Sequence, residues 1–198
     1  MKTSHIVEGY GPLDMFLAKQ RYKVAKRRIY SAQKSGRILD IGCGSHPLFL
    51  TNINFAEKYG LDKNIESCVT DQGIVLINHY IEEEEKLPFE GNFFDVVSML
   101  AVFEHIEPEQ LVRIHGEINR VLKPGGIYVM TTPAFWTEGL LKFLVKLRLI
   151  SGVSISEHKD SYDSSMVSSI LQAAGFPKNN LRFGYFELFM NMWSTAVK

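Results

Sequence analysis

The sequence predicts an α/β fold, a Rossmann-like, doubly wound and mostly parallel sheet with helices on both faces. Two observations support this prediction. Runs rich in β-branched and apolar residues alternate with amphipathic stretches, and the first run, residues 37–41, leads through the glycine-rich turn GCGSHP into a helical stretch. Such alternation pairs strands in parallel and places helices on both faces of the sheet. Because ligands of these sheets bind beyond the carboxyl ends of the strands, we expect a crevice beside Gly42 and Gly44.

Length and composition are those of one globular domain. The chain has 198 residues, of which 45% are hydrophobic and 22% are charged, enough to bury a substantial core. We expect a single domain over 1–198, with an N-terminal helical cap at 1–35 and a core at 36–198 that carries an amphipathic insertion at 137–160. The formal net charge is zero, so the chain as a whole has no electrostatic attraction for a nucleic acid or an anionic membrane.

The cysteine and hydropathy patterns predict a cytoplasmic protein. Cys43 and Cys68 form no C-x-x-C pair and no secretory leader is evident, so we expect two free thiols in a reducing compartment. No apolar run reaches the roughly 20 residues that a membrane-spanning helix needs.

The first half of the chain is expected to hold three strands. Apolar residues at helical spacing predict a helix over 13–31 whose opposite face is basic. The strand at 37–41 and the glycine turn follow, and then a helix that ends before the motif KYG. The remaining expected elements are a strand ending at Asp62, a helix through 64–73 and a strand near 73–78.

The second half continues the alternation. FDVVSML, at 94–100, is typical of a buried strand. The helix expected at 108–122 has Pro108 in its first turn and is stopped by KPGG. The remaining expected elements are a strand at 127–133, a helix at 163–174 and two late strands at 181–186 and 192–197.

Acidic residues around the glycine turn favour a cationic ligand. Glycine lets the backbone approach a ligand closely, and an acidic residue about 20 positions later can accept hydrogen bonds from both ribose hydroxyls. Gly42 and Asp62 fit that spacing. A dinucleotide is disfavoured, because Pro47 replaces the third glycine of G-x-G-x-x-G and because Asp40 would repel a pyrophosphate. S-adenosylmethionine carries a sulfonium and an ammonium group beside its adenosine, so it suits this acidic mouth.

Five stretches, in order, resemble the class I S-adenosylmethionine-dependent methyltransferases: ILDIGCGS, YGLD, EEEEKLPFEGNFFDVVSML, FEHI and INRVLKPGGIYVMTTP. The resemblance extends from Arg37 to about Gly175. It implies a seven-stranded sheet with a reversed C-terminal hairpin, which the two late strands accommodate. It also implies S-adenosylmethionine as cofactor and S-adenosylhomocysteine as product. The chain departs from the family in the loop, where His46 and Pro47 stand in place of another glycine.

The resemblance also implies roles for individual residues. The glycine turn and Asp40 would line the methionine end of the cofactor, Asp62 would hold the ribose, and Leu100 would lie against the ligand. Glu83 or Glu84 would meet the adenine amino group, but a run of four glutamates is most often a solvated loop, so the choice stays open. The predicted cofactor-binding residues are Asp40, Gly42, Cys43, Gly44, Asp62, Lys63, Glu83, Glu84 and Leu100.

Two histidines are candidate catalytic residues. His105 lies between the fourth strand and the next helix, where it could act as a general base or order the entry to that helix. His158, in SEHKDSY, lies where many relatives place substrate contacts, and it could equally cap the following helix. Neither H-E-x-x-H nor a thiolate-rich spacing is present, so no metal site is predicted.

The acceptor is less constrained than the cofactor. In methyl transfer the sulfonium activates the carbon, and the protein mainly aligns the reactants. SMLAVFEH replaces the D/N-P-P-Y/F motif of amide- and base-methylating enzymes, which favours a small-molecule, glycan or lipid-linked acceptor. Two alternatives stay open: a tRNA or rRNA methyltransferase that uses the basic first helix, and a non-catalytic partner subunit that keeps the fold.

The amphipathic stretch GLLKFLVKLRLI, at 139–150, follows the fifth strand beside the acceptor side of the crevice. Eight of its twelve residues are apolar, and as a helix it would extend only about 18 Å, too short to span a bilayer. It is either an ordinary core helix or a lid or membrane-interface segment, which would make the protein peripheral to the membrane.

Overall fold

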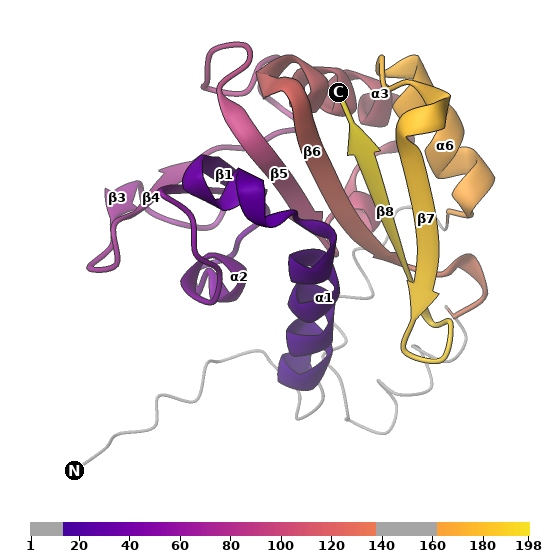
Figure 1. Ribbon diagram of the computed structural model, residues 1–198, viewed down its shortest axis with the longest axis horizontal. Helices are drawn as coiled ribbons and strands as arrows, with labels where there is room; N and C mark the ends of the chain where they lie inside the picture. The colour runs from indigo at the N-terminus through magenta and orange to yellow at the C-terminus, as the bar shows by residue number, and fades with distance from the viewer. Residues whose placement is uncertain (1–13, 138–161) are drawn as a thin grey trace.

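The computed structural model describes residues 14–137 and 162–198, which form an eight-stranded sheet in the order β3-β4-β2-β1-β5-β6-β8-β7 (Figure 1). Neighbouring strands among β4, β2, β1, β5 and β6 are parallel, whereas β8 runs antiparallel to both β6 and β7. The mostly parallel sheet and its reversed C-terminal hairpin are therefore confirmed. The strands are β1 (Arg37–Ile41), β2 (Glu57–Asp62), β3 (Cys68–Val69), β4 (Ile74–Asn78), β5 (Phe94–Leu100), β6 (Leu122–Pro133), β7 (Leu181–Phe186) and β8 (Asn191–Val197).

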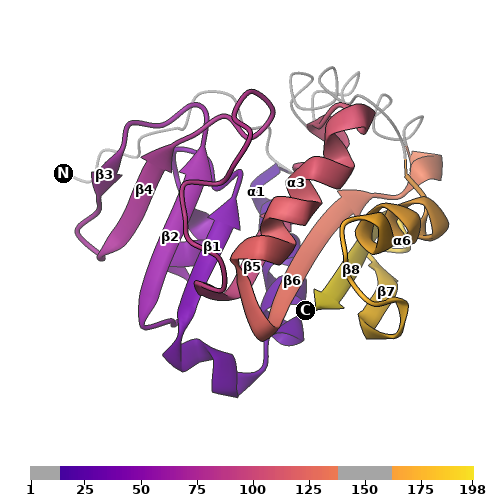
Figure 2. The same ribbon diagram turned by 90° about the horizontal axis from the view of Figure 1, so that it is seen from above.

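Helices cover both faces of this sheet (Figure 2). One face carries α1 (Asp14–Arg28) and α2 (Leu48–Thr51), which bury Ala25, Phe49 and Leu50 against the strands. The other carries α3 (Pro108–Val121) and α6 (Ser164–Ala173). Each face has its own apolar cluster, so the sheet is buried on both sides as parallel sheets require. The short 3₁₀ helices are η1 (Ser31–Ser35), η2 (Phe103–His105), η3 (Phe135–Thr137) and η4 (Lys178–Asn180).

The two helices on the α3 face begin where the sequence predicts. Pro108 is the first residue of α3, where its missing N–H costs nothing. The α3 stripe Leu111, Ile114, Ile118 and Val121 is buried. Asp163 caps α6 by accepting hydrogen bonds from the backbone N–H groups of Ser165 and Met166, both at 2.8 Å.

The prediction of a helix through 64–73 is wrong, because that segment instead forms turns and the two-residue strand β3. Two hydroxyl side chains of the segment accept hydrogen bonds from backbone N–H groups at the two ends of β4, and these bonds compete with a helical conformation. Ser67 Oγ accepts a hydrogen bond from Asn78 N at 2.9 Å, and Thr70 Oγ1 accepts one from Ile74 N at 3.1 Å. Gly73 then turns the chain with a φ of 68°. The extra strand makes the sheet eight-stranded and not seven-stranded.

Two element boundaries also differ from expectation. The helix after the glycine turn, α2, has only four residues. It ends where the Asn52 side chain donates from Nδ2 to Leu48 O at 2.8 Å. Strand β6 begins at Leu122 and includes KPGG, with an irregular register opposite Phe94 and Val96. The predicted strand at 127–133 is thus the regular part of a longer strand.

Several predictions concern residues outside the described ranges. The amphipathic insertion at 137–160 lies almost wholly there, as do the stretch 139–150 and His158. Within the described ranges, no helix is both long enough and apolar enough to cross a membrane.

Candidate active site

The glycine turn is fixed by backbone geometry at the carboxyl end of β1. Gly42 and Gly44 both adopt left-handed conformations, with φ of 74° and 67°. The backbone N–H groups of Gly42 and Cys43 both donate to Leu61 O, at 2.8 and 3.1 Å. A Cβ atom on Gly42 would lie 2.2 Å from Cγ2 of Val102. Only glycine fits at position 42, because the turn is held between β2 and the segment after β5.

Asp40 is a buried carboxylic acid directly below this turn. The strand register places it beside Gly60 of β2 and Ser98 of β5, and only 4% of its surface is exposed. Ser98 Oγ donates to Asp40 Oδ1 at 2.7 Å. Burial raises the pKa of Asp40 to about 7, the Ser98 hydrogen bond lowers it, and the nearby charge of Asp62 raises it again. A cation at the mouth of the turn would favour the charged form of Asp40.

Asp62, the last residue of β2, holds the turn from the side. Its Oδ2 accepts a hydrogen bond from Gly44 N at 2.9 Å, and its Oδ1 accepts one from Asn64 N at 2.8 Å. Each carboxylate oxygen has a further lone pair for a ligand hydroxyl. The sequence predicted only a ligand contact for Asp62. The tight turn DKN, which begins at Asp62, was the available signal for its backbone role.

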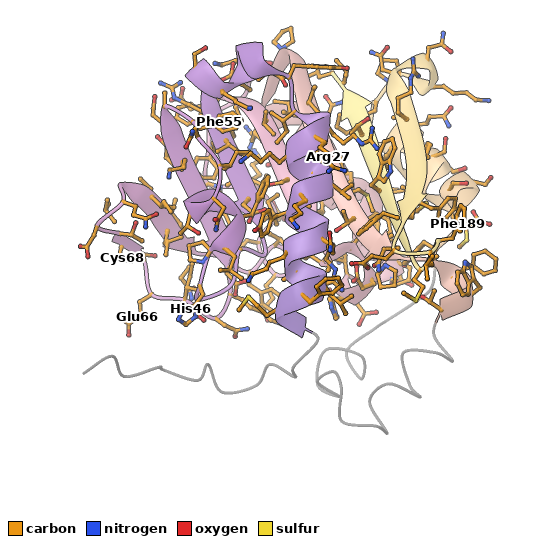
Figure 3. All side chains as sticks on the ribbon, turned by 60° about the horizontal axis from the view of Figure 1, so that its bottom comes forward. Arg27, His46, Phe55, Glu66, Cys68 and Phe189 are labelled. Carbon is orange, nitrogen blue, oxygen red and sulfur yellow. The ribbon has the colours of Figure 1, made fainter. Side chains whose placement is uncertain are left out.

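The other residues predicted around the turn differ in character. Cys43 is buried and its Sγ lies 3.6 Å from Gly44 O. Burial raises the pKa of this thiol well above its usual range, which disfavours the reactive thiolate form. Lys63 holds its Nζ 4.8 Å from the ring centroid of Tyr80. Leu100 ends β5 half-buried against the α1 face of the sheet. His46 points outward from the same end of the molecule (Figure 3).

The acidic loop, defined as residues 81–85, follows β4, which lies next to β2 in the sheet. Glu84 contacts His79 through Oε1 and Nδ1 at 3.1 Å, and the same oxygen accepts from Tyr80 N at 3.4 Å. Glu82 accepts a hydrogen bond from Glu107 N at 3.2 Å. Glu83 is exposed, and its carboxylate has no hydrogen-bond or ion-pair partner among the described residues. Of the two candidates for the adenine contact, Glu83 is therefore the one with a free carboxylate.

All of these residues share one end of the sheet. Asp40, Gly42, Cys43, Gly44 and Asp62 form one connected cluster, while Lys63, Leu100 and the acidic loop follow the ends of β2, β5 and β4. Sequence reasoning missed Ser98 and Val102, which come from a strand and a turn that only the folded sheet brings beside the glycines.

Comparisons with known proteins point to methyltransferases. A family model described as a methyltransferase domain matches residues 39–130, from β1 to β6. The chain is 26% identical over 180 residues to the demethylmenaquinone methyltransferase of Staphylococcus aureus, covering 80% of this chain and 72% of that protein. An S-adenosylmethionine-dependent methyltransferase from Thermotoga maritima superposes with a TM-score of 0.66 at 16% identity, covering 93% of this chain and 90% of that one. Together, the methyltransferase-domain match and the methyltransferase relatives support a class I S-adenosylmethionine-dependent methyltransferase.

A second solved structure supports the same fold for this methyltransferase. A phosphoethanolamine N-methyltransferase of Haemonchus contortus, solved with phosphomonomethylethanolamine and S-adenosylhomocysteine, has a TM-score of 0.62 at 17% identity. The match covers 91% of this chain and 53% of that one. S-adenosylmethionine is the methyl donor of the family.

The acceptor side of the methyltransferase is described only in part. His105 ends η2, just after β5, and is half-buried at the same end of the sheet as the glycine turn. Its neighbour Glu104 is buried. His158, the other candidate base, lies outside the described residues, so the structure does not bring the two histidines together.

Proposed function

We propose that this methyltransferase transfers a methyl group from S-adenosylmethionine to a small-molecule, glycan or lipid-linked acceptor. The methionine end of the cofactor is assigned to Asp40 and the glycine turn, the ribose to Asp62, and the adenine amino group to Glu83. Lys63 and Leu100 would flank the cofactor. The bound cofactor supplies a methyl group on a sulfonium centre, and the residues of this chain bind and orient it.

The observation that carries the proposal is the buried Asp40 under a left-handed glycine turn. A pyrophosphate at this position would face a carboxylate, whereas an ammonium or sulfonium group would neutralise it. The turn leaves room for a ligand above Gly44, since a Cβ atom on that residue would meet nothing within 4 Å. The residues present therefore fit S-adenosylmethionine better than a dinucleotide.

The acceptor class rests on two supporting observations. The Staphylococcus aureus relative is a demethylmenaquinone methyltransferase, which is consistent with a small-molecule acceptor for this chain. The segment after β5 reads Ala101–Val102–Phe103, without the D/N-P-P-Y/F motif of amide- and base-methylating enzymes. A general base, for which His105 and His158 remain the candidates, would be needed only for a hydroxyl acceptor.

An RNA acceptor has weaker support. It would depend on the cations of α1, but Arg28 stacks over the Trp193 ring at 3.7 Å and Lys26 donates to Asn52 O at 3.3 Å. Arg27, by contrast, extends from α1 on the face shown in Figure 3. Part of the basic helix face is thus used within the fold.

Binding and turnover are tested separately. Titration calorimetry is expected to show binding of S-adenosylhomocysteine and no binding of NAD. Incubation with methyl-labelled S-adenosylmethionine and cell extracts depleted in turn of RNA, protein, lipid or small molecules is expected to lose label transfer only when small molecules or lipids are removed. Tight NAD binding without S-adenosylhomocysteine binding would contradict the cofactor, and loss of transfer on RNA removal alone would contradict the acceptor.

Affinity for S-adenosylmethionine is expected to rise by roughly tenfold between pH 6 and pH 8. Below its folded pKa of about 7 Asp40 is mostly neutral, and as the pH rises through that value the carboxylate forms and attracts the cationic ligand. Calorimetric titrations across this range measure the effect.

Two variants identify Asp40 as the group responsible. Asp40→Asn is expected to flatten the pH dependence. Ser98→Ala removes the hydrogen bond that lowers the Asp40 pKa, so the midpoint is expected to move to higher pH. An unchanged pH profile in folded Asp40→Asn would show that another group titrates.

A further inference from the structure

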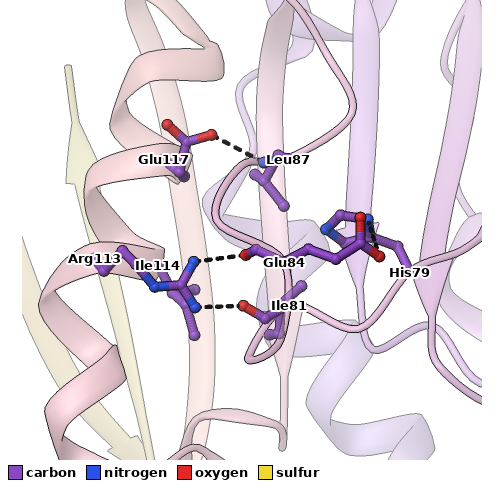
Figure 4. A pocket seen from close by; sticks show the side chains of 7 residues that line it. All are labelled: His79, Ile81, Glu84, Leu87, Arg113, Ile114 and Glu117. Atoms are coloured by element: carbon purple, nitrogen blue, oxygen red, sulfur yellow. Dashed lines mark hydrogen bonds and ion pairs between the residues drawn. The ribbon is translucent and has the colours of Figure 1, made fainter.

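A side chain of helix α3 holds the acidic loop in place by hydrogen bonds to the backbone of the loop (Figure 4). Arg113 lies one helical turn before Glu117. The Arg113 side chain faces the acidic loop, and Glu117 accepts a hydrogen bond from Leu87 N just beyond it, at 2.9 Å. Arg113 donates five hydrogen bonds: one to Gln110 Oε1 at 2.8 Å and four to loop carbonyls. The carbonyl acceptors are Ile81 O at 2.7 Å, Glu82 O at 3.2 Å, Glu84 O at 2.7 Å and Glu85 O at 3.1 Å.

This contact uses the full geometry of a guanidinium group. The planar fork reaches carbonyls on both sides of Glu83 at once, which the three donors of a lysine ammonium cannot do with the same fixed directions. The positive charge also lies against the backbone of a segment with four consecutive glutamates, Glu82 to Glu85. Arg113 therefore fixes the path of the loop backbone.

In this loop the carboxylate of one glutamate is exposed, and the carboxylates of two others are bound within the protein. Glu84 is held by His79, whose side chain is nearly fully buried, and Glu82 accepts from the start of α3. Glu83 remains exposed between the two. The pocket behind the loop has an empty volume of about 170 Å³, including open solvent, which is below the roughly 300 Å³ of a typical small-molecule site. This pocket lies between the loop and α3. We therefore expect the adenine on the other side of the loop, where Glu83 is exposed.

We propose that Arg113 is a positioning residue that sets adenine recognition by holding Glu83 toward the cofactor. This inference rests on the proposed function, since it takes Glu83 as the acceptor of the adenine amino group. Arg113 itself would touch no part of the cofactor. It determines how well the enzyme distinguishes an adenine, which has an exocyclic amino group, from a hypoxanthine, which has a carbonyl oxygen in its place.

The test compares two ligands in two variants. S-adenosylhomocysteine and S-inosylhomocysteine differ in that one position, so the ratio of their dissociation constants reports the amino-group contact. The parent enzyme is expected to prefer the adenosine ligand at least tenfold. Arg113→Lys keeps the charge and loses the fork, and it is expected to reduce that preference to about twofold or less, mainly by weakening the adenosine ligand.

Arg120→Lys is the matched control. Arg120 is on the same helix and donates to Phe89 O at 2.9 Å and Leu87 O at 3.3 Å, beyond the acidic part of the loop. Arg120→Lys is expected to keep the parental preference even if its melting temperature falls as much as that of Arg113→Lys. Equal preference in folded Arg113→Lys and in the parent, or a parent that does not discriminate, would overturn the inference. A parent that binds neither ligand would instead contradict the cofactor assignment.

Discussion

Asp62→Ala is expected to weaken binding of S-adenosylhomocysteine by about 2 to 4 kcal/mol, roughly 30- to 1,000-fold. The variant loses the proposed hydrogen bonds to the ribose hydroxyls. It also loses the hydrogen bonds that the carboxylate accepts from Gly44 N and Asn64 N, at 2.9 and 2.8 Å. The effect on the ligand is therefore direct and, through the turn, indirect. Calorimetric titration measures it.

Asp62→Asn separates the two contributions. Its amide oxygen can still accept from one of the two backbone N–H groups, while the amide nitrogen cannot accept from a ribose hydroxyl. The expected loss is smaller than in Asp62→Ala, with little change in melting temperature. Normal affinity in a folded Asp62→Ala protein would show that the ribose assignment is wrong.

Gly42→Ala is expected to abolish measurable cofactor binding and to lower the free energy of unfolding by about 2 to 5 kcal/mol. A left-handed alanine costs about 1 to 2 kcal/mol, and a Cβ atom 2.2 Å from Val102 Cγ2 adds an overpacking cost of about 1 to 3 kcal/mol. Because the turn lies between β2 and the segment after β5, it cannot move without breaking its hydrogen bonds to Leu61 O. Denaturant unfolding and calorimetry measure the two effects.

Two further variants test the steric explanation. Gly44→Ala has the same left-handed strain, but its Cβ atom would meet nothing within 4 Å, so it is expected to be less destabilising. Val102→Ala removes the clashing methyl group, and the double variant Gly42→Ala/Val102→Ala is expected to regain part of the stability lost by Gly42→Ala. If the double variant is no more stable than additivity predicts, the clash is not the cause.

The sequence predicts most of this fold because most of its strands are buried on both faces. FDVVSML and IYVMTTP contain β-branched and apolar residues with little interruption, a pattern that fits β5 and the regular part of β6. The segment 64–73 has no such signal. Its conformation depends on hydrogen bonds from Ser67 and Thr70 to strand β4, which is adjacent only after folding.

The same distinction applies to the candidate site. Asp40, Gly42 and Asp62 are identified by spacing along the chain, and the structure does bring them together. The choice between Glu83 and Glu84 could not be made from a run of identical residues, because it depends on His79 and Arg113, which hold the loop from β4 and α3. The partner of Asp40, Ser98, is likewise set by the register of β1 against β5.

Strand β3 also changes how this protein can associate with other chains. Without it, the apolar strand β4 would end the sheet with unpaired backbone groups, a template on which another molecule could add a strand. Here Cys68 and Val69 pair with Leu76 and Val75, while Thr70 and Ser67 take the N–H groups of Ile74 and Asn78. A two-residue strand and two hydroxyl groups thus close this edge, and aggregation through β4 would first require the segment to peel away.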